Sequence, residues 1–135
     1  MRAAGPALAV ALLLSGCGSA SADLFKVERA GKGDGAKLTL IASDDGTVRC
    51  NGRSVPLGAE RLLEARQLAR DLGTQAALGL ELKPGPKEDT TFTYRAELAD
   101  GTVSFADSSR GLPPTYTRLA AFTRQVARGT CGLKR

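Results

Sequence analysis

Residues 91–106 read TFTYRAELADGTVSFA, and they carry the clearest pattern of secondary structure in the chain. Hydrophobic and polar residues alternate along residues 91–99, as they do in a strand that buries one face. Asp100-Gly101 follows, a dipeptide that favours the tight turn of a β-hairpin, and residues 102–106 alternate again. The sequence therefore predicts a hairpin of two antiparallel strands.

The same pattern occurs earlier in the chain. Asp45-Gly46 is followed by Thr-Val, as Asp100-Gly101 is, and it separates two alternating segments, residues 37–43 and 47–51. Asp-Gly suits the positive φ angles of a two-residue type I′ turn, so we expect that turn here. Residues 24–29 also alternate and predict one more strand at the start of the domain.

Each predicted hairpin is followed by a segment with apolar residues at helical spacing. These segments are residues 58–72, which we expect Gly73 to end, and residues 115–128, which follow Pro113-Pro114. The order is β-ββα-ββα. It predicts an α+β fold with an antiparallel sheet of about five strands and two helices on one face. Residues 74–89 are predicted to be an irregular segment that is either functional or mobile.

The composition excludes several kinds of site. The chain has 135 residues, enough for one domain, and it contains no histidine and three cysteines. A Ser-His-Asp triad, a histidine-ligated metal and a thiolate zinc site are therefore excluded. We predict a protein that is not an enzyme and holds no metal or cofactor, although an enzyme that uses carboxylates alone stays open.

The N-terminus has the pattern of an export signal. Residues 7–14 are an apolar run too short to span a bilayer, and it ends in Leu14-Ser15-Gly16-Cys17. This tetrapeptide resembles the lipobox of bacterial lipoproteins. The resemblance implies a signal peptide over residues 1–16, a diacylglyceryl group on Cys17, and a flexible tether over residues 17–23. Residues 24–135 would then form one domain on the outer face of the bacterial cell membrane. The alternative is an ordinary secretory signal with a chance cysteine.

Two cysteines remain, Cys50 and Cys131. An even pair in an exported chain predicts one disulfide, which would close a loop of about 80 residues. Two free thiols or a redox pair are the alternatives, and the Cys-x-x-Cys spacing that a redox pair favours is absent from the sequence.

Positive charge is concentrated at the C-terminal end. Residues 108–135 contain six basic residues and no acidic one. Arg118, Arg124 and Arg128 lie opposite the apolar side of the last predicted helix. They predict an anion-facing surface, for lipid headgroups, a cell-wall polymer or an acidic protein, or else a solvated helix face. We expect no nucleic-acid partner, because no aromatic residues alternate with the basic ones.

Part of the domain resembles a known family. The run from residue 91 to residue 125 contains Phe92, Tyr94, Leu98, Gly101 and Val103, then Pro113, Pro114 and the last predicted helix. This run is similar to emfourins, which are small inhibitors of thermolysin-like metallopeptidases with a few strands and two helices. The similarity assigns no inhibitory residue. The whole chain also resembles small lipoproteins of high-GC Gram-positive bacteria.

Three functions follow as expectations. The first is a membrane-anchored, non-catalytic binding module for an envelope protein or polymer. The second, implied by the resemblance, is a peptidase inhibitor. The third is a weak binder of anionic lipid or cell-wall polymer.

Overall fold

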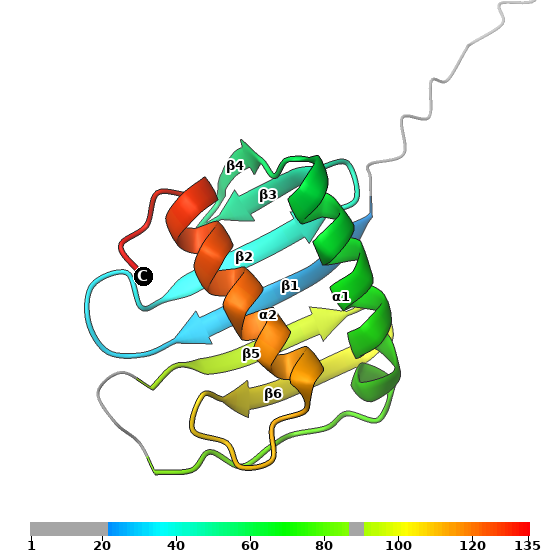
Figure 1. The fold of residues 1–135 in the computed structure, drawn as a ribbon, viewed down its shortest axis with the longest axis vertical. Helices are drawn as coiled ribbons and strands as arrows, with labels where there is room; N and C mark the ends of the chain where they lie inside the picture. Colours follow the sequence, from blue (N-terminus) through cyan, green and yellow to red (C-terminus); the bar gives the residue numbers. More distant parts are fainter. Residues whose placement is uncertain (1–21, 87–90) are drawn as a thin grey trace, which may run out of the picture.

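The structure is a computed structural model, and it describes residues 22–86 and 91–135. It contains a six-stranded antiparallel sheet in the order β4-β3-β2-β1-β5-β6, and both helices cover the same face of the sheet (Figure 1). The predicted α+β class is confirmed, with one strand more than expected. The elements are β1 (Asp23–Ala30), β2 (Leu38–Ser43), β3 (Thr47–Cys50), β4 (Arg53–Pro56), α1 (Ala59–Ala77), β5 (Thr93–Leu98), β6 (Gly101–Ala106) and α2 (Pro114–Gln125), which continues as the π-helix η1 (Val126–Thr130).

The additional strand is β4, at one edge of the sheet. It pairs with β3 through a turn at Asn51 and Gly52, whose φ angles are 48° and 87°. Two successive positive φ angles define a type I′ turn, and Asn-Gly is the dipeptide that favours it most. The Asn51-Gly52 dipeptide therefore indicates a hairpin between β3 and β4, which the prediction of a single strand over residues 47–51 did not include.

The turn between β2 and β3 also differs from the prediction. Of Asp45 and Gly46, only Gly46 has a positive φ, 88°, so the two-residue type I′ turn is wrong. Three residues, 44–46, separate the strands, and the Gly46 N–H donates to the Ser43 carbonyl at 3.2 Å. The Asp45 carboxylate accepts hydrogen bonds from the Thr47 hydroxyl and N–H, and these bonds lower the pKa of Asp45. This side-chain bonding stabilises a longer turn that leaves Asp45 with an ordinary φ.

Helix α1 continues past its expected end. It runs to Ala77, and Gly73 lies inside it, buried against the turn between β5 and β6. A Cβ atom at Gly73 would lie 3.0 Å from the Asp100 carboxylate. Gly73 is therefore a point of close approach between helix and sheet, and the prediction that it ends the helix is wrong.

The predicted irregular segment 74–89 divides into parts. Residues 74–77 belong to α1, and residues 80–82 pair with the outer edge of β6. There the Leu82 N–H donates to the Ser104 carbonyl at 2.9 Å, and the Ser104 N–H donates to the Leu80 carbonyl at 3.2 Å. This pairing covers an edge that would otherwise expose unpaired backbone groups. Residues 87–89 lie outside the described residues.

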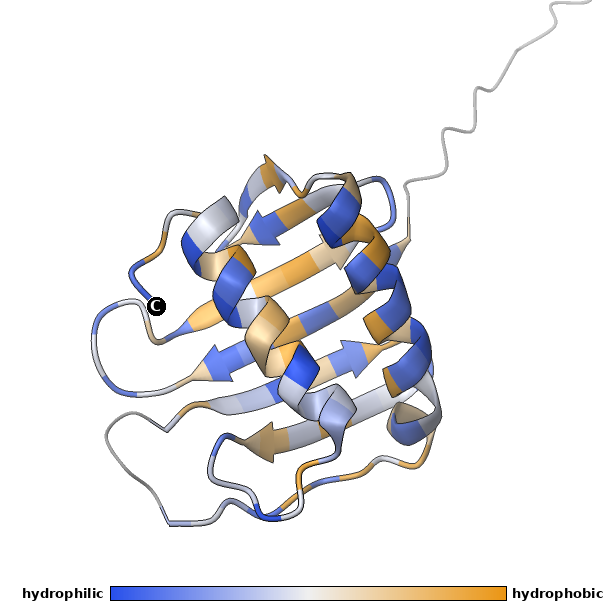
Figure 2. Cartoon of the chain, viewed as in Figure 1, coloured by the Kyte–Doolittle hydropathy of each residue, from blue (hydrophilic) through white to orange (hydrophobic). Residues whose placement is uncertain are grey.

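The core lies between the sheet and the two helices. Every second residue of a strand points toward the helices, and these side chains pack against the apolar faces of α1 and α2. Hydrophilic residues are spread over the outer sides of both helices (Figure 2). Tyr94, Phe105 and Tyr116 stack with ring centroids 4.9 and 5.1 Å apart. The largest apolar side chains of the core that are fully buried include Phe25, Val27, Leu38, Leu40, Leu68, Leu72, Leu119 and Phe122.

Candidate functional site

The three arginines expected to form an anion-facing surface have different surroundings in the structure. Arg118 lies in the first half of α2, and its guanidinium donates to the Asp71 carboxylate of α1 at 2.8 Å. Arg124 and Arg128 lie further along, at the end of α2 and in η1, and both are exposed. Arg118 thus takes part in a contact between the two helices, whereas the side chains of Arg124 and Arg128 are exposed to solvent.

The C-terminal tail adds two more cations beside Arg124 and Arg128. The Leu133 N–H donates to the Ala127 carbonyl at 2.8 Å, which turns the tail back along η1. Lys134 and Arg135 follow and are exposed. We call Arg124, Arg128, Lys134 and Arg135 the basic end of the domain. Within residues 22–86 and 91–135, none of these four side chains lies within ion-pair distance of a carboxylate.

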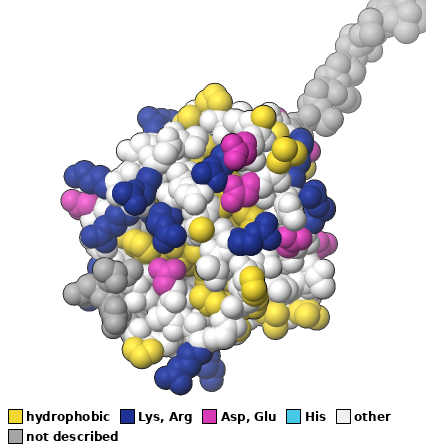
Figure 3. Space-filling model, in the orientation of Figure 1, with side chains coloured by type: hydrophobic (Ala, Val, Ile, Leu, Met, Phe, Trp, Pro, Cys, Tyr) yellow, Lys and Arg dark blue, Asp and Glu magenta, His cyan; other side chains and the backbone are white. Residues whose placement is uncertain are grey.

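The space-filling view shows this end of the molecule. Lysine and arginine side chains gather on the left of Figure 3, where Figure 1 places the C-terminus and the loop between β1 and β2. Asp34 in that loop and Asp107 after β6 are the acidic residues of the neighbouring loops that the structure describes. Positive charge predominates there.

A buried arginine holds the tail against the β1–β2 loop. Arg29 is 1% exposed on β1, and its guanidinium donates to the carbonyls of Ala36 at 3.0 Å, Gly35 at 2.9 Å and Arg135 at 2.9 Å. It also lies over the Phe92 ring, 4.8 Å from the centroid. Burial lowers the pKa of Arg29, and the guanidinium stays charged because its ordinary pKa is so high. Arg29 therefore joins three segments that are far apart in the sequence.

Further contacts fix the tail from its other side. Cys50 of β3 and Cys131 form a disulfide, with Cα atoms 6.2 Å apart, as the cysteine count predicted. The Arg53 guanidinium of β4 donates to the Cys131 carbonyl at 2.6 Å, and the Arg135 guanidinium donates to the Lys32 carbonyl at 2.8 Å. The backbone that carries the basic end is thus held in one place by a covalent bond and several hydrogen bonds.

Tyr94 lies next to Arg29 beneath this end. Burial, and then the nearby Asp107 carboxylate, raise the pKa of Tyr94 to about 12. Asp107 also accepts a hydrogen bond from the Phe92 N–H at 3.2 Å. A phenol with so high a pKa stays protonated at neutral pH, so Tyr94 is a hydrogen-bonding core residue and a poor proton acceptor.

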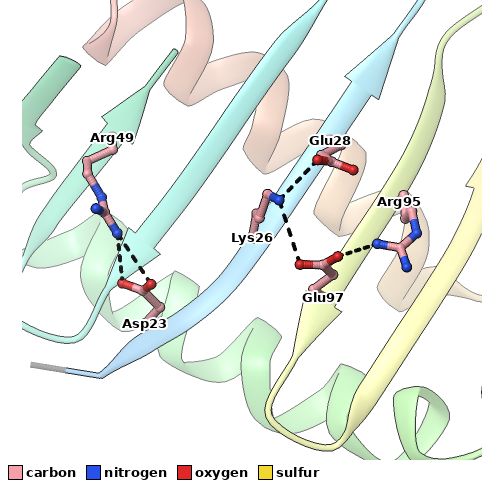
Figure 4. Close-up of polar contacts among 6 residues, drawn as sticks. All are labelled: Asp23, Lys26, Glu28, Arg49, Arg95 and Glu97. Carbon is pink, nitrogen blue, oxygen red and sulfur yellow. Dashed lines mark hydrogen bonds and ion pairs between the residues drawn. The ribbon is translucent and has the colours of Figure 1, made fainter. Parts of the chain in front are cut away.

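The face of the sheet that carries no helix is polar. Lys26 of β1 lies 3.0 Å from the Glu28 carboxylate and 3.8 Å from that of Glu97, which also pairs with Arg95 (Figure 4). The hydrogen bond to Glu28 is the main cause that raises the pKa of Lys26, and the hydrogen bond from Arg95 is the main cause that lowers the pKa of Glu97. These charges neutralise one another across neighbouring strands.

A broad groove of about 760 Å³ crosses one half of this polar face. Its floor comes from β2, β1, β5 and β6, and the segment 81–84 forms one wall. The polar residues that line it include Glu28, Thr39, Glu81, Lys83, Arg95 and Ser104. Its lining contains both charge signs, from Glu28 and Glu81 and from Lys37, Lys83 and Arg95.

Cys17 and Leu14-Ser15-Gly16 lie outside the described residues, so the predicted lipid site has no structural description here. Among the helices that the structure describes, none has the length and apolar character to cross a membrane. Over the same part of the chain, no three histidine, cysteine, aspartate or glutamate side chains gather as metal ligands would. No family model, curated protein or solved structure matches this chain.

The sequence predicted the disulfide and placed Arg124 and Arg128 on the exposed side of the last helix, but it assigned no role to Arg29. An arginine at an inward position of an alternating strand is the signal that could have found it, because charged residues are seldom fully buried without partners. Its partners are backbone carbonyls 6, 7 and 106 residues away, which leave no mark in the side-chain pattern.

Proposed function

We propose that this protein is a non-catalytic binding module, anchored by lipid on the outer face of the bacterial cell membrane. The proposal joins two features of the chain. One is the lipobox-like tetrapeptide that ends at Cys17, and the other is a folded domain with an unbalanced charge at one end.

The distance between the two features supports the anchor. Strand β1 begins at Asp23, six residues after Cys17. A chain of six residues spans at most about 20 Å when fully extended, so the domain would stay close to the bilayer surface. Two acyl chains on one cysteine give stable attachment, whereas one chain gives marginal attachment.

The observation that carries the binding role is the basic end. Four cations stand on a helix end and a tail whose backbone is fixed by Arg29 and by the disulfide. Within the described chain, none of the four lies within ion-pair distance of a carboxylate. Charges held in one geometry lose less conformational entropy on binding than charges on a mobile tail. Such an end is suited to hold an anionic partner.

The anchor is tested by fractionation of cells that express wild-type protein or the Cys17→Ser variant. We expect wild-type protein in the membrane fraction, with the mass of a diacylglyceryl group on Cys17, and the variant in the soluble fraction or with its leader attached. Wild-type protein with an unmodified Cys17 would contradict the proposal.

A second function, inhibition of a thermolysin-like metallopeptidase, is supported by the number of elements. The resemblance to emfourins implies a few strands and two helices, and the chain has six strands and two long helices. Titration of a thermolysin-like enzyme with the purified protein tests this function. Stoichiometric loss of activity would support inhibition, and unchanged activity at excess protein would exclude it for that enzyme.

A further inference from the structure

We propose that the basic end binds a phosphate-bearing polymer located on the far side of the domain from the membrane. This inference rests on the lipid anchor proposed above, and it adds the direction of the binding surface and the chemistry of its partner.

The direction follows from the course of β1. The strand starts at Asp23, next to the proposed anchor, and its eight residues extend about 25 Å to Ala30 at the opposite end of the sheet. The β1–β2 loop follows Ala30, and Arg29 and Arg135 fasten the tail to that loop. In Figure 1 the N-terminal end of β1 and the C-terminus accordingly lie on opposite sides of the domain. The basic end therefore lies away from the anchor.

The end nearer the anchor has a different charge. Asp23 lies there with the two hairpin turns that carry Asp44, Asp45 and Asp100. Arg49 and Arg66 pair with Asp23 and Asp44 at 3.3 and 2.6 Å. Arg70 lies at the same end with Asp23, Asp44 and Asp100, so acidic residues balance the positive charge there. When the start of β1 points toward the bilayer, the basic end lies some 25 Å from it and is screened from its charge, because the Debye length in physiological salt is about 8 Å.

The chemistry of the partner follows from the cations themselves. Three of the four are arginines, and a guanidinium binds a phosphate group through two parallel hydrogen bonds. The four side chains come from α2, η1 and the tail, so they form a surface and not a closed pocket. A surface of this kind fits successive phosphates of a polymer better than one small anion.

The strength of binding should depend steeply on salt. If four phosphates of a flexible chain lose their counterions on binding, the affinity falls with salt at a logarithmic slope of about −2.8. Between 50 and 200 mM salt this slope corresponds to a loss of about 50-fold.

The test uses the full-length, lipidated protein in phosphatidylcholine vesicles, with fluorescent linear polyphosphate as the probe. Vesicle flotation reports the anchor, and fluorescence in the floated fraction reports polymer binding. In one variant Arg124, Arg128 and Lys134 are changed to glutamine, and Arg135 is kept because it holds the tail to the β1–β2 loop. In a control of equal charge, Arg70, Lys83 and Arg110 are changed to glutamine; all three are exposed, lie outside that loop and form no ion pair within the described chain.

We expect wild-type and control proteins to bind polyphosphate with the salt dependence given above. The basic-end variant should bind at least ten-fold more weakly at 50 mM salt while keeping the wild-type melting temperature. Equal loss in both variants would overturn the inference, since binding would then follow net charge alone. Unchanged binding in the basic-end variant would also overturn it.

A second arm distinguishes the polymer from lipid headgroups. Phosphatidylglycerol is added to the bilayer that holds the anchor, and we expect wild-type protein to bind polyphosphate as before. Loss of polymer binding under these conditions would mean that the basic end faces its own membrane, and the inference would fail. Protein that does not float refutes the anchor alone, because polymer binding can then be measured by anisotropy in solution.

Discussion

Removal of the Cys50–Cys131 disulfide should lower the free energy of unfolding by about 4.5 kcal/mol. The bond joins residues 81 positions apart, and the entropy of an unfolded loop of that length gives this value in the chain-entropy model. Cys50 is 5% exposed and Cys131 2% exposed, so the bond lies within packed structure. At about 4 °C per kcal/mol for a domain of this size, the melting temperature should fall by roughly 15–20 °C.

The assay is thermal unfolding followed by circular dichroism, with and without a thiol reductant. The matched variant carries Cys50→Ala and Cys131→Ala together, because serine would add a buried hydroxyl with a free-energy penalty of its own. We expect reductant to lower the melting temperature of wild-type protein to near that of the double variant. Reductant should leave the double variant unchanged.

Two results would refute this reasoning. One is a wild-type melting temperature that shifts by less than about 3 °C when mass spectrometry shows both thiols reduced, which would mean that loop entropy contributes little. The other is a double variant that still responds to reductant, since the response could not then come from this bond.

Three further predictions concern packing, titration and charge. Gly101→Ala should destabilise the domain by about 2–4 kcal/mol, because its Cβ would lie 2.2 Å from a carbonyl oxygen of α1. Gly79→Ala, also at positive φ but with open space around it, should lose only about 1 kcal/mol in the same denaturant titration. Burial raises the pKa of Tyr94 to about 12, so the stability contributed by its neutral phenol is complete below pH 10, and roughly 3 kcal/mol should be lost as the pH rises to 12. Tyr94→Phe should therefore show a flatter decline in stability over that range, and an equal decline would contradict the assignment. Arg118→Ala removes an exposed ion pair with Asp71, so urea titration should show a loss below about 1 kcal/mol, and polyphosphate binding should not change.

The strands that the sequence predicted well are those with one buried face. In β5 the buried Tyr94 and Ala96 alternate with exposed Thr93 and Arg95, and this period of two is visible without any tertiary information. The β4 strand has four residues, of which only Val55 is partly buried. Its pattern is too weak to be found by alternation, and only the Asn-Gly turn before it points to a strand.

The wrong predictions for the end of α1 and for the segment that follows it have a common cause. Glycine is typical of a position just after a helix, but at position 73 the absence of a side chain is explained by the close contact with the β5–β6 turn. Leu80 and Leu82 were expected in an irregular segment, and they pair with β6 because that strand would otherwise be an open edge. Both outcomes depend on a neighbour in space, which local sequence does not specify.

The α+β class, the disulfide and the concentration of positive charge near the C-terminus were predictable from the amino-acid sequence, because alternation, residue type and cysteine count can be read without a structure. The grouping of the cations on a surface depends on the folded arrangement. The tertiary structure paired Arg118 with a helix that lies 47 residues earlier in the chain, and it brought Arg135 beside a loop 103 residues earlier. The physical reason is that Arg29 and the disulfide fix the direction of the tail, and their partners become neighbours only when the sheet has formed.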